Sequence, residues 1–221
     1  MIKLSYSSIY ILYNSSHQWI NQAMGIKQED KYYFKEGRDA GRIIEDHVAG
    51  IKKHPLLSHI TERFSVVEQK DFDPRVKFEF SPKEGYVIRG YADGLDKEKK
   101  AVLEVKSSGV TKDKVTGELK CNYWTVTKFL KSMQRKVYSI GFPWSKEAFI
   151  ITAPRLPEQW KMFPPKLMSL PQTEQDKKEA MEWILGGIKI LEAGDFTGGL
   201  VDGRCIDPWC NYGKNCYFKK L

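Results

Sequence analysis

The feature that most constrains the fold is a group of short segments between residues 63 and 106 with the character of β-strands. These segments, RFSVVEQ, VKFEF, YVIRGYAD and AVLEVK, are rich in β-branched or aromatic residues, and proline, glycine or charged clusters separate them. Short runs of this composition, divided by such breaks, are typical of strands joined by turns. The sequence therefore predicts a meander of strands in this part of the chain.

Helical periodicity is found on both sides of these strands. An aromatic-rich helix is predicted from about Ser5 to Met24, and a second helix over KEGRDAGRIIEDHVAGIKK. A long helix is predicted over residues 122–140, then a strand at EAFIITAP and a last helix from about Thr173 to Leu191. This order predicts an α/β fold with a central mixed β-sheet flanked by α-helices.

The length of 221 residues suits a single domain with one sizeable core. We expect a helical N-terminal part at about 1–60, a central core at about 61–155, and a C-terminal helix with a cysteine-containing tail at about 156–221. Lysine and arginine number 36 against 28 acidic residues, a net charge of +8 that permits a nucleic-acid partner without establishing one. No apolar stretch approaches a membrane span, so we expect an intracellular, cytoplasmic protein without a membrane partner.

The strand AVLEVKSS carries charged side chains where a core strand is usually apolar. Because side chains alternate between the two faces of a strand, Ala101, Leu103 and Val105 are predicted on one face. Glu104 and Lys106 share the opposite face. One face of this strand is thus predicted to lie in the core, and the other to carry chemistry.

The preceding strand, YVIRGYAD, ends in Asp93, and the polar segment GLDKEKK after it predicts a hairpin turn near Glu98 or Lys99. Antiparallel pairing about that turn places Asp93 almost opposite Glu104. Two adjacent carboxylates repel each other unless a cation lies between them, and Mg²⁺ prefers oxygen ligands. Lys106 could then orient or deprotonate water, or stabilise charge on a phosphate. The alternative is a turn cap at Asp93 and a solvated Glu104–Lys106 ion pair.

The segment GYADGLDKEKKAVLEVKSS resembles the core of the PD-(D/E)XK nuclease superfamily, in particular its RecB-like branch with Cas4-like and phage exonucleases. That branch has an Asp in a G-x-x-D setting, a hairpin, then Glu or Asp, any residue, Lys and a small hydroxyl residue. The matching residues here are Gly90, Asp93, Glu104, Lys106 and Ser107, with Ala92 in place of the proline in the superfamily's name. The resemblance implies a restriction-endonuclease-like core.

The same branch carries Gln-x-x-x-Tyr on the helix after the catalytic strand, which is similar to QRKVY from Gln134 to Tyr138. Helical periodicity places these two side chains one turn apart on a polar face, and we expect them to hold Lys106 or a DNA phosphate. For the lysines of this face, a solvated helix surface is the alternative. The residues expected to contact DNA are Ser107, Lys128, Lys131 and Arg135.

The resemblance also implies a divalent metal, Mg²⁺ or Mn²⁺, held by Asp93, Glu104 and the backbone carbonyl of Val105. Many members have a further histidine ligand after a glycine on an early helix, and EGRDAGRIIEDHVAG makes His47 the candidate and Gly41 the close-packing glycine. A lone helical histidine is more commonly structural, so the role of His47 depends on the resemblance. The remaining histidines are predicted to be surface residues: His17, His54 and His59.

Three of the four cysteines lie near the C-terminus, in CIDPWCNYGKNCYF. This segment resembles the C-terminal half of the [4Fe-4S] site of some RecB-like nucleases. Cys205, Cys210 and Cys216 would then need a fourth ligand, for which Cys121 is the candidate. Zinc and free buried thiols are the alternatives.

Together these observations predict a metal-dependent deoxyribonuclease, an exonuclease that hydrolyses phosphodiester bonds of single-stranded DNA or DNA ends. A site-specific endonuclease on the same fold is one alternative, although no inserted recognition module is evident. The other is a non-catalytic DNA-binding or assembly subunit, against which the intact D…E-x-K pattern argues.

Overall fold

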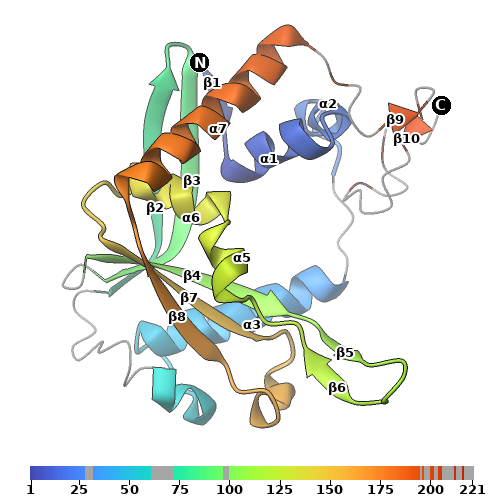
Figure 1. The fold of residues 1–221 in the computed structure, drawn as a ribbon, viewed down its shortest axis with the longest axis vertical. Coiled ribbons are helices and arrows are strands. Elements are labelled where there is room, and N and C mark those ends of the chain that lie inside the picture. The colour runs from blue at the N-terminus through green and yellow to red at the C-terminus, as the bar shows by residue number, and fades with distance from the viewer. Residues whose placement is uncertain are drawn as a thin grey trace. The chain divides into compact units, whose positions relative to one another are not determined.

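The computed structural model describes residues 1–27, 32–60, 72–96, 100–194, 196, 200–201, 204–205, 212 and 216 (Figure 1). The predicted strand RFSVVEQ lies outside these residues. The chain forms two compact units, each built from segments that are not contiguous in sequence. The first consists of Met1–Lys31, Glu79–Gly90 and Lys178–Leu221, and the second of Tyr32–Phe78 and Tyr91–Lys177.

The second unit is built on a mixed sheet, as predicted. The strands of this sheet follow the order β3 (Tyr86–Asp96), β4 (Ala101–Ser108), β7 (Glu147–Pro154) and β8 (Lys166–Pro171), and β2 (Phe72–Lys83) also pairs with β3. Residues 72–78 of β2 and 91–96 of β3 belong to the second unit, and the other residues of these two strands belong to the first. The β3–β4 and β7–β8 pairs are antiparallel, whereas β4 and β7 are parallel. Parallel strands need a long crossover, and residues 109–146 supply it.

One face of this sheet packs against α3 (Tyr32–Val48). Apolar side chains of α3 and of the strands form one core cluster, which includes Ala40, Ile44, Val48, Ala101, Leu103, Phe149 and Ile151, with Val105 packed against it. The predicted alternation along β4 is therefore confirmed. This face of β4 belongs to the core.

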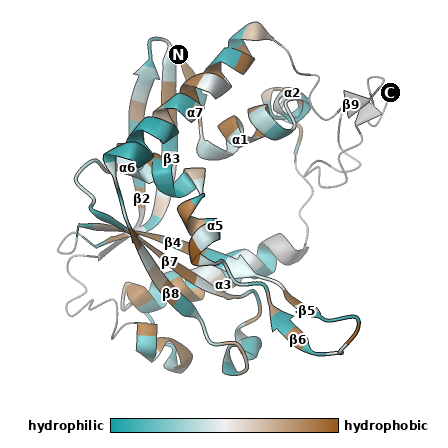
Figure 2. Cartoon of the chain, viewed as in Figure 1, coloured by the Kyte–Doolittle hydropathy of each residue, from teal (hydrophilic) through white to brown (hydrophobic). Residues whose placement is uncertain are grey.

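The opposite face packs against α5 (Val126–Leu130), whose hydrophobic residues are brown in Figure 2. Phe129 joins Ala148 and Ile150 of β7 in a second cluster, against which Trp124 and Met168 pack. The sheet thus has helices on both faces, which is the predicted fold class.

The predicted long helix over residues 122–140 is two shorter helices, α5 and α6 (Met133–Gly141), interrupted at Lys131 and Ser132. Thr125 starts α5 as its N-cap, because its side chain accepts a hydrogen bond from the Lys128 backbone N–H. Between β4 and α5 lies a hairpin of β5 (Val110–Lys112) and β6 (Leu119–Cys121), which was not predicted. Its strands have only three residues each and contain too few apolar positions to show alternation.

In the first unit, the helix predicted from Ser5 to Met24 is also divided, into α1 (Tyr6–Asn14) and α2 (His17–Ala23). The Ser15 backbone leaves the helical conformation at this point. The strand β1 (Ile2–Leu4) precedes α1 and pairs in parallel with β3 at Tyr86–Ile88. His17 is fully buried, so the prediction that it is a surface residue is wrong.

The last predicted helix is confirmed as α7 (Glu174–Ala193). Within the first unit, Tyr13 of α1 stacks on Trp183 of α7 with ring centroids 5.6 Å apart. The remaining elements are the 3₁₀ turns η1 (Pro55–Leu57) and η3 (Pro157–Lys161) and the paired short strands β9 (Leu200–Val201) and β10 (Arg204–Cys205). Of the helices in the described part of the chain, none has the length and apolarity needed to cross a membrane.

Candidate active site

The β3–β4 hairpin places the two motif carboxylates together. The paired residues are Gly94↔Leu103, Leu95↔Val102 and Asp96↔Ala101, and one step further the same register brings Asp93 opposite Glu104. This is the predicted register, although the turn at 97–99 is outside the described residues. Asp93 Oδ2 accepts a hydrogen bond of 2.7 Å from the Val105 backbone N–H, which fixes the carboxyl beside β4.

Glu104 and Lys106 share the polar face of β4 with two side chains of α6. Lys106 Nζ pairs with Glu104 Oε1 and donates to Gln134 Oε1 at 2.9 Å. Gln134 Nε2 donates to the Tyr138 hydroxyl at 2.9 Å, and that hydroxyl donates to Glu104 Oε2. The four side chains form a closed ring, because positions four apart on α6 reach the same strand face.

Burial is the main cause of the raised pKa values of Asp93 and Tyr138 at this site. Glu104 is only 4% exposed, and burial together with the Glu104 charge raises the pKa of Asp93 to about 7, although the Val105 N–H and Lys106 act in the opposite direction. Burial and the nearby carboxylates also hold the pKa of Tyr138 well above its usual value. Tyr138 therefore stays protonated and can donate to Glu104.

Glu45 of α3 is a candidate that the sequence reasoning missed. Its side chain is buried, and its charge contributes to the raised pKa of Asp93. The available signal was a carboxylate directly beside Ile44, on the border of the buried arc of the helix. A charged residue at such a border is rarely buried without a role or a partner.

His47 lies on the same helix, but its ring is fully engaged elsewhere. Its Nδ1 accepts a hydrogen bond of 2.8 Å from the His54 backbone N–H, and its Nε2 lies 3.1 Å from the Leu57 carbonyl oxygen. Burial is the main cause that lowers the pKa of His47, which favours the neutral ring. This geometry contradicts the expected metal-ligand role, since neither ring nitrogen is available. His47 instead fastens the end of α3 to the following segment.

Ser107 faces α3 rather than the ring around Glu104. A Cβ atom added to Gly37 would lie 2.6 Å from Ser107 Oγ, whereas one added to Gly41 would meet Glu45 Oε1 at an ordinary 3.7 Å. The close-packing glycine is therefore Gly37, and the prediction of Gly41 is wrong. The proposed DNA contact of Ser107 stays a prediction.

Arg135 is buried, which contradicts the prediction that it lies on an exposed polar face. It is 1% exposed and donates to both carboxylate oxygens of Asp176, at 2.9 and 2.5 Å. This pairing makes it unavailable to DNA. The prediction assumed one continuous helix, but the break at residues 131–132 changes the helical phase. Lys128 and Lys131 are exposed, so their contact with DNA stays a prediction.

The oxygen donors around Asp93 fit a hard divalent cation. Glu104 is buried and Asp93 is half-buried, and desolvation together with the Glu104 charge raises the pKa of Asp93, so a cation between the two carboxylates would remove this cost. In the part of the chain that the structure describes, no three His, Cys, Asp or Glu side chains form a ready-made metal group. Asp93 and Glu104 would therefore need the Val105 carbonyl and water to complete the ligand set, which is how Mg²⁺ is commonly bound.

The cysteines expected to hold an iron–sulfur cluster are only partly described. Cys210 lies outside the described residues, and Cys205 is in β10. Cys216 is buried beside Tyr212 and lies 3.3 Å from Asn21 Nδ2. Cys121, in β6, belongs to the other unit. The cluster stays a prediction, and zinc or free thiols remain the alternatives.

Similarity to known proteins is found among solved structures. No protein family and no curated protein matches the chain. Among solved structures, a protein from Eubacterium rectale, provisionally named an exonuclease, aligns with a TM-score of 0.50 and 12% identity, over 86% of this chain and 80% of that one.

Two further solved structures are similar. The alkaline exonuclease LHK-Exo from Laribacter hongkongensis has a TM-score of 0.48 and 13% identity, over 87% of this chain and 89% of its own. A phage-related exonuclease from Haemophilus somnus has a TM-score of 0.42 and 11% identity, over 87% and 94%. The mixed sheet between helices and the alignment with the Eubacterium rectale protein show that this chain shares the fold of that protein.

Proposed function

We propose that the protein is a metal-dependent deoxyribonuclease, an exonuclease that hydrolyses phosphodiester bonds of single-stranded DNA or DNA ends. The observation that supports this most is the meeting of Asp93, Glu104 and Lys106 at one hairpin, with a pKa of about 7 for Asp93. Buried carboxylates beside a lysine are costly to a fold, so such groups are commonly functional.

Asp93, Glu104 and the Val105 carbonyl are the groups that would hold Mg²⁺ or Mn²⁺. When bound, the ion would polarise the phosphate and lower the pKa of bound water. Tyr138 keeps the Glu104 carboxylate in place through its protonated hydroxyl. Glu45, whose charge acts on Asp93, adds to the negative potential that attracts a cation.

Lys106 is the candidate for stabilising charge on the reacting phosphate. Gln134 and Glu104 hold its ammonium group, so that little reorganisation is needed when a substrate binds. In this position it can donate to a non-bridging phosphate oxygen or orient the attacking water. Water then forms a new bond to phosphorus and gives up a proton, one ester P–O bond breaks, and the leaving oxygen takes up a proton.

The exposed lysines of α5 and the segment after it support DNA as the substrate. Lys128 and Lys131 are exposed on a chain with net charge +8. Lysines of this kind bind phosphates without reading the base sequence. The name of the Eubacterium rectale protein favours an exonuclease over an endonuclease.

The test is incubation of end-labelled single-stranded DNA, end-labelled duplex DNA and closed circles with the protein and Mg²⁺, Mn²⁺ or EDTA. We expect loss of the labelled linear DNA with either metal, intact closed circles, and no reaction in EDTA. Cutting of closed circles would favour the endonuclease alternative. DNA binding without cleavage under any divalent metal would favour the non-catalytic subunit.

A further inference from the structure

Trp124 lies directly beside the candidate active site, in the segment between β6 and α5. Its ring centroid is 5.7 Å from Lys106 Nζ and 4.7 Å from Lys128 Nζ. One of these cations belongs to the ring of Glu104 and Gln134, and the other is exposed on α5. The indole is therefore near both the proposed site of hydrolysis and a lysine that faces solvent.

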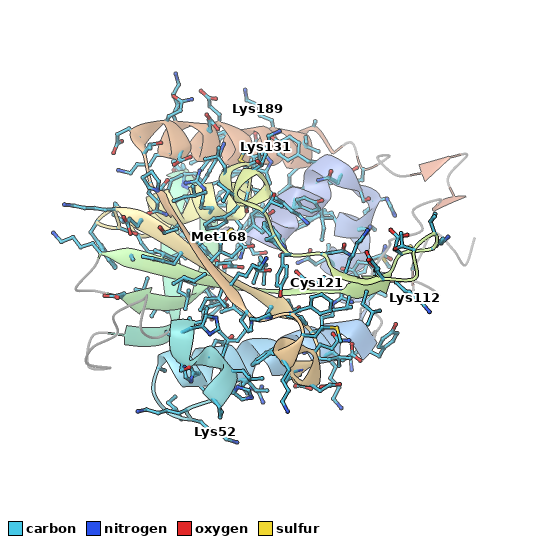
Figure 3. All side chains as sticks on the ribbon, turned by 60° about the horizontal axis from the view of Figure 1, so that its bottom comes forward. Lys52, Lys112, Cys121, Lys131, Met168 and Lys189 are labelled. Atoms are coloured by element: carbon cyan, nitrogen blue, oxygen red, sulfur yellow. The ribbon has the colours of Figure 1, made fainter. Side chains whose placement is uncertain are left out.

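The orientation of Trp124 is fixed by the body of the second unit. Its backbone N–H donates to Thr152 Oγ1 of β7 at 3.2 Å. Its side chain packs against the apolar cluster of Phe129, Ala148 and Ile150, against which Met168, labelled in Figure 3, also packs, yet it remains only half-buried. An aromatic ring held in this way loses little entropy when it stacks on a ligand.

The preceding residue repeats the arrangement. Tyr123 donates its hydroxyl hydrogen to the Pro164 carbonyl at 2.8 Å, and Lys166 Nζ lies 4.3 Å from its ring centroid. Within the described residues, neither Lys128 nor Lys166 forms an ion pair with a carboxylate. Two neighbouring aromatic rings are thus each accompanied by a lysine that is free to bind an anion.

We propose that Trp124 stacks on a base of single-stranded DNA whose phosphates are bound by Lys128 and Lys166, and that this contact leads the strand to Lys106. Alternating aromatic rings and cations match the alternation of bases and phosphates along a strand. A base inside a duplex is paired and stacked on both faces, whereas an unpaired base offers its face to the indole. This inference depends on the proposed function and specifies its substrate as an unpaired strand.

The test measures binding of a fluorescein-labelled single-stranded oligonucleotide in EDTA by the Glu104→Gln protein, which prevents cleavage. Trp124→Leu in this background keeps an apolar side chain and removes the aromatic face. We expect it to weaken binding by about tenfold to a hundredfold, the range found for loss of base–aromatic stacking. Trp144→Leu, at a 41% exposed tryptophan in the same unit, is the matched control and should leave the affinity unchanged.

An abasic oligonucleotide of the same length separates stacking from a general loss of structure. Because it lacks bases, it should bind with equal affinity to the Glu104→Gln protein and to the Glu104→Gln protein that also carries Trp124→Leu. Equal weakening of the normal and abasic strands, or normal binding within twofold of the background, would overturn the inference. If the wild-type protein cleaves DNA but Trp124→Leu does not weaken binding, only this inference is refuted. If binding depends on the bases but the wild-type protein cleaves no DNA, only the nuclease function is refuted.

Discussion

The two faces of β4 contrast sharply. Ala101 and Leu103 are fully buried against α3 and form ordinary apolar packing. Glu104 is almost as deeply buried on the opposite face, but its partners are Lys106 and Tyr138. Burial of apolar groups stabilises a fold, whereas burial of charges usually does not, even when they are paired. Equal burial within one strand thus serves stability on one face, and on the other it holds the charged groups that we propose to be catalytic.

The raised pKa of Asp93 indicates how unfavourable a second negative charge is beside the polar face of β4. Near neutral pH the polar face holds one carboxyl group only partly ionised, because burial and Glu104 oppose its charge. A face selected for stability alone would replace these groups with apolar ones. Changes on the apolar face should therefore reduce stability, and changes on the polar face should reduce activity.

Among the partners of Glu104, Lys106 should show the largest effect, and Lys106→Met keeps most of the side-chain volume while it removes the ammonium group. Cleavage of single-stranded DNA should fall by about 100-fold to 1000-fold, as with loss of one donor to a transition-state charge. Lys112→Met, at an exposed lysine of the β5 strand, is the control and should cleave normally. Normal cleavage by Lys106→Met would show that the polar face has no catalytic lysine.

Leu103→Ala tests the apolar face. It should lower the free energy of unfolding by about 2–5 kcal/mol, since it leaves a cavity between β4 and α3. Cleavage at a temperature where the variant is folded should change little. Urea unfolding measures the first quantity, and Leu119→Ala, at a half-exposed position, should change it by no more than about 0.5 kcal/mol.

The pH dependence of stability tests Asp93. Its pKa is about 7 in the folded protein against an ordinary value of 3.8, so the folded state binds more protons between these values. In EDTA, stability should therefore fall as pH rises from about 4 to 7, by a few kcal/mol at most. Asp93→Asn should remove this slope, and Mg²⁺ or Mn²⁺ should reduce it. A slope unchanged in Asp93→Asn would assign it to another group.

The smallest effect is expected from Tyr138→Phe, which removes the hydroxyl that donates to Glu104. Tyr138 is a positioning residue here, so cleavage should fall by about tenfold, because Glu104 loses a partner but keeps its charge. The Mn²⁺ concentration for half-maximal activity should rise as well. A lower rate with an unchanged Mn²⁺ requirement would indicate a general loss of packing instead.

Sequence reasoning was most successful where the period of a strand determined the outcome. The faces of β4 and the register that brings Asp93 to Glu104 follow from alternation and a symmetric turn, and both are present in the structure. The four-residue spacing of Gln134 and Tyr138 likewise survived the division of their helix, because both belong to α6.

The errors arose where distant contacts decide the role of a side chain. Arg135 is held by Asp176, which lies 41 positions away in the sequence, and His47 by the backbone of His54 and Leu57. Periodicity on one helix gives no information about such partners. Glu45 was missed for the same reason, since its relation to Asp93 depends on how α3 packs on the sheet.

The most direct test of the account compares wild-type protein with Glu104→Gln in a time course of single-stranded DNA degradation with Mn²⁺. The substitution keeps the shape of the side chain and removes the charge that would hold the metal. We predict that the variant remains folded and that its rate falls by about 1000-fold or more. Degradation at the wild-type rate by Glu104→Gln would contradict the assignment of the polar face of β4 as the active site.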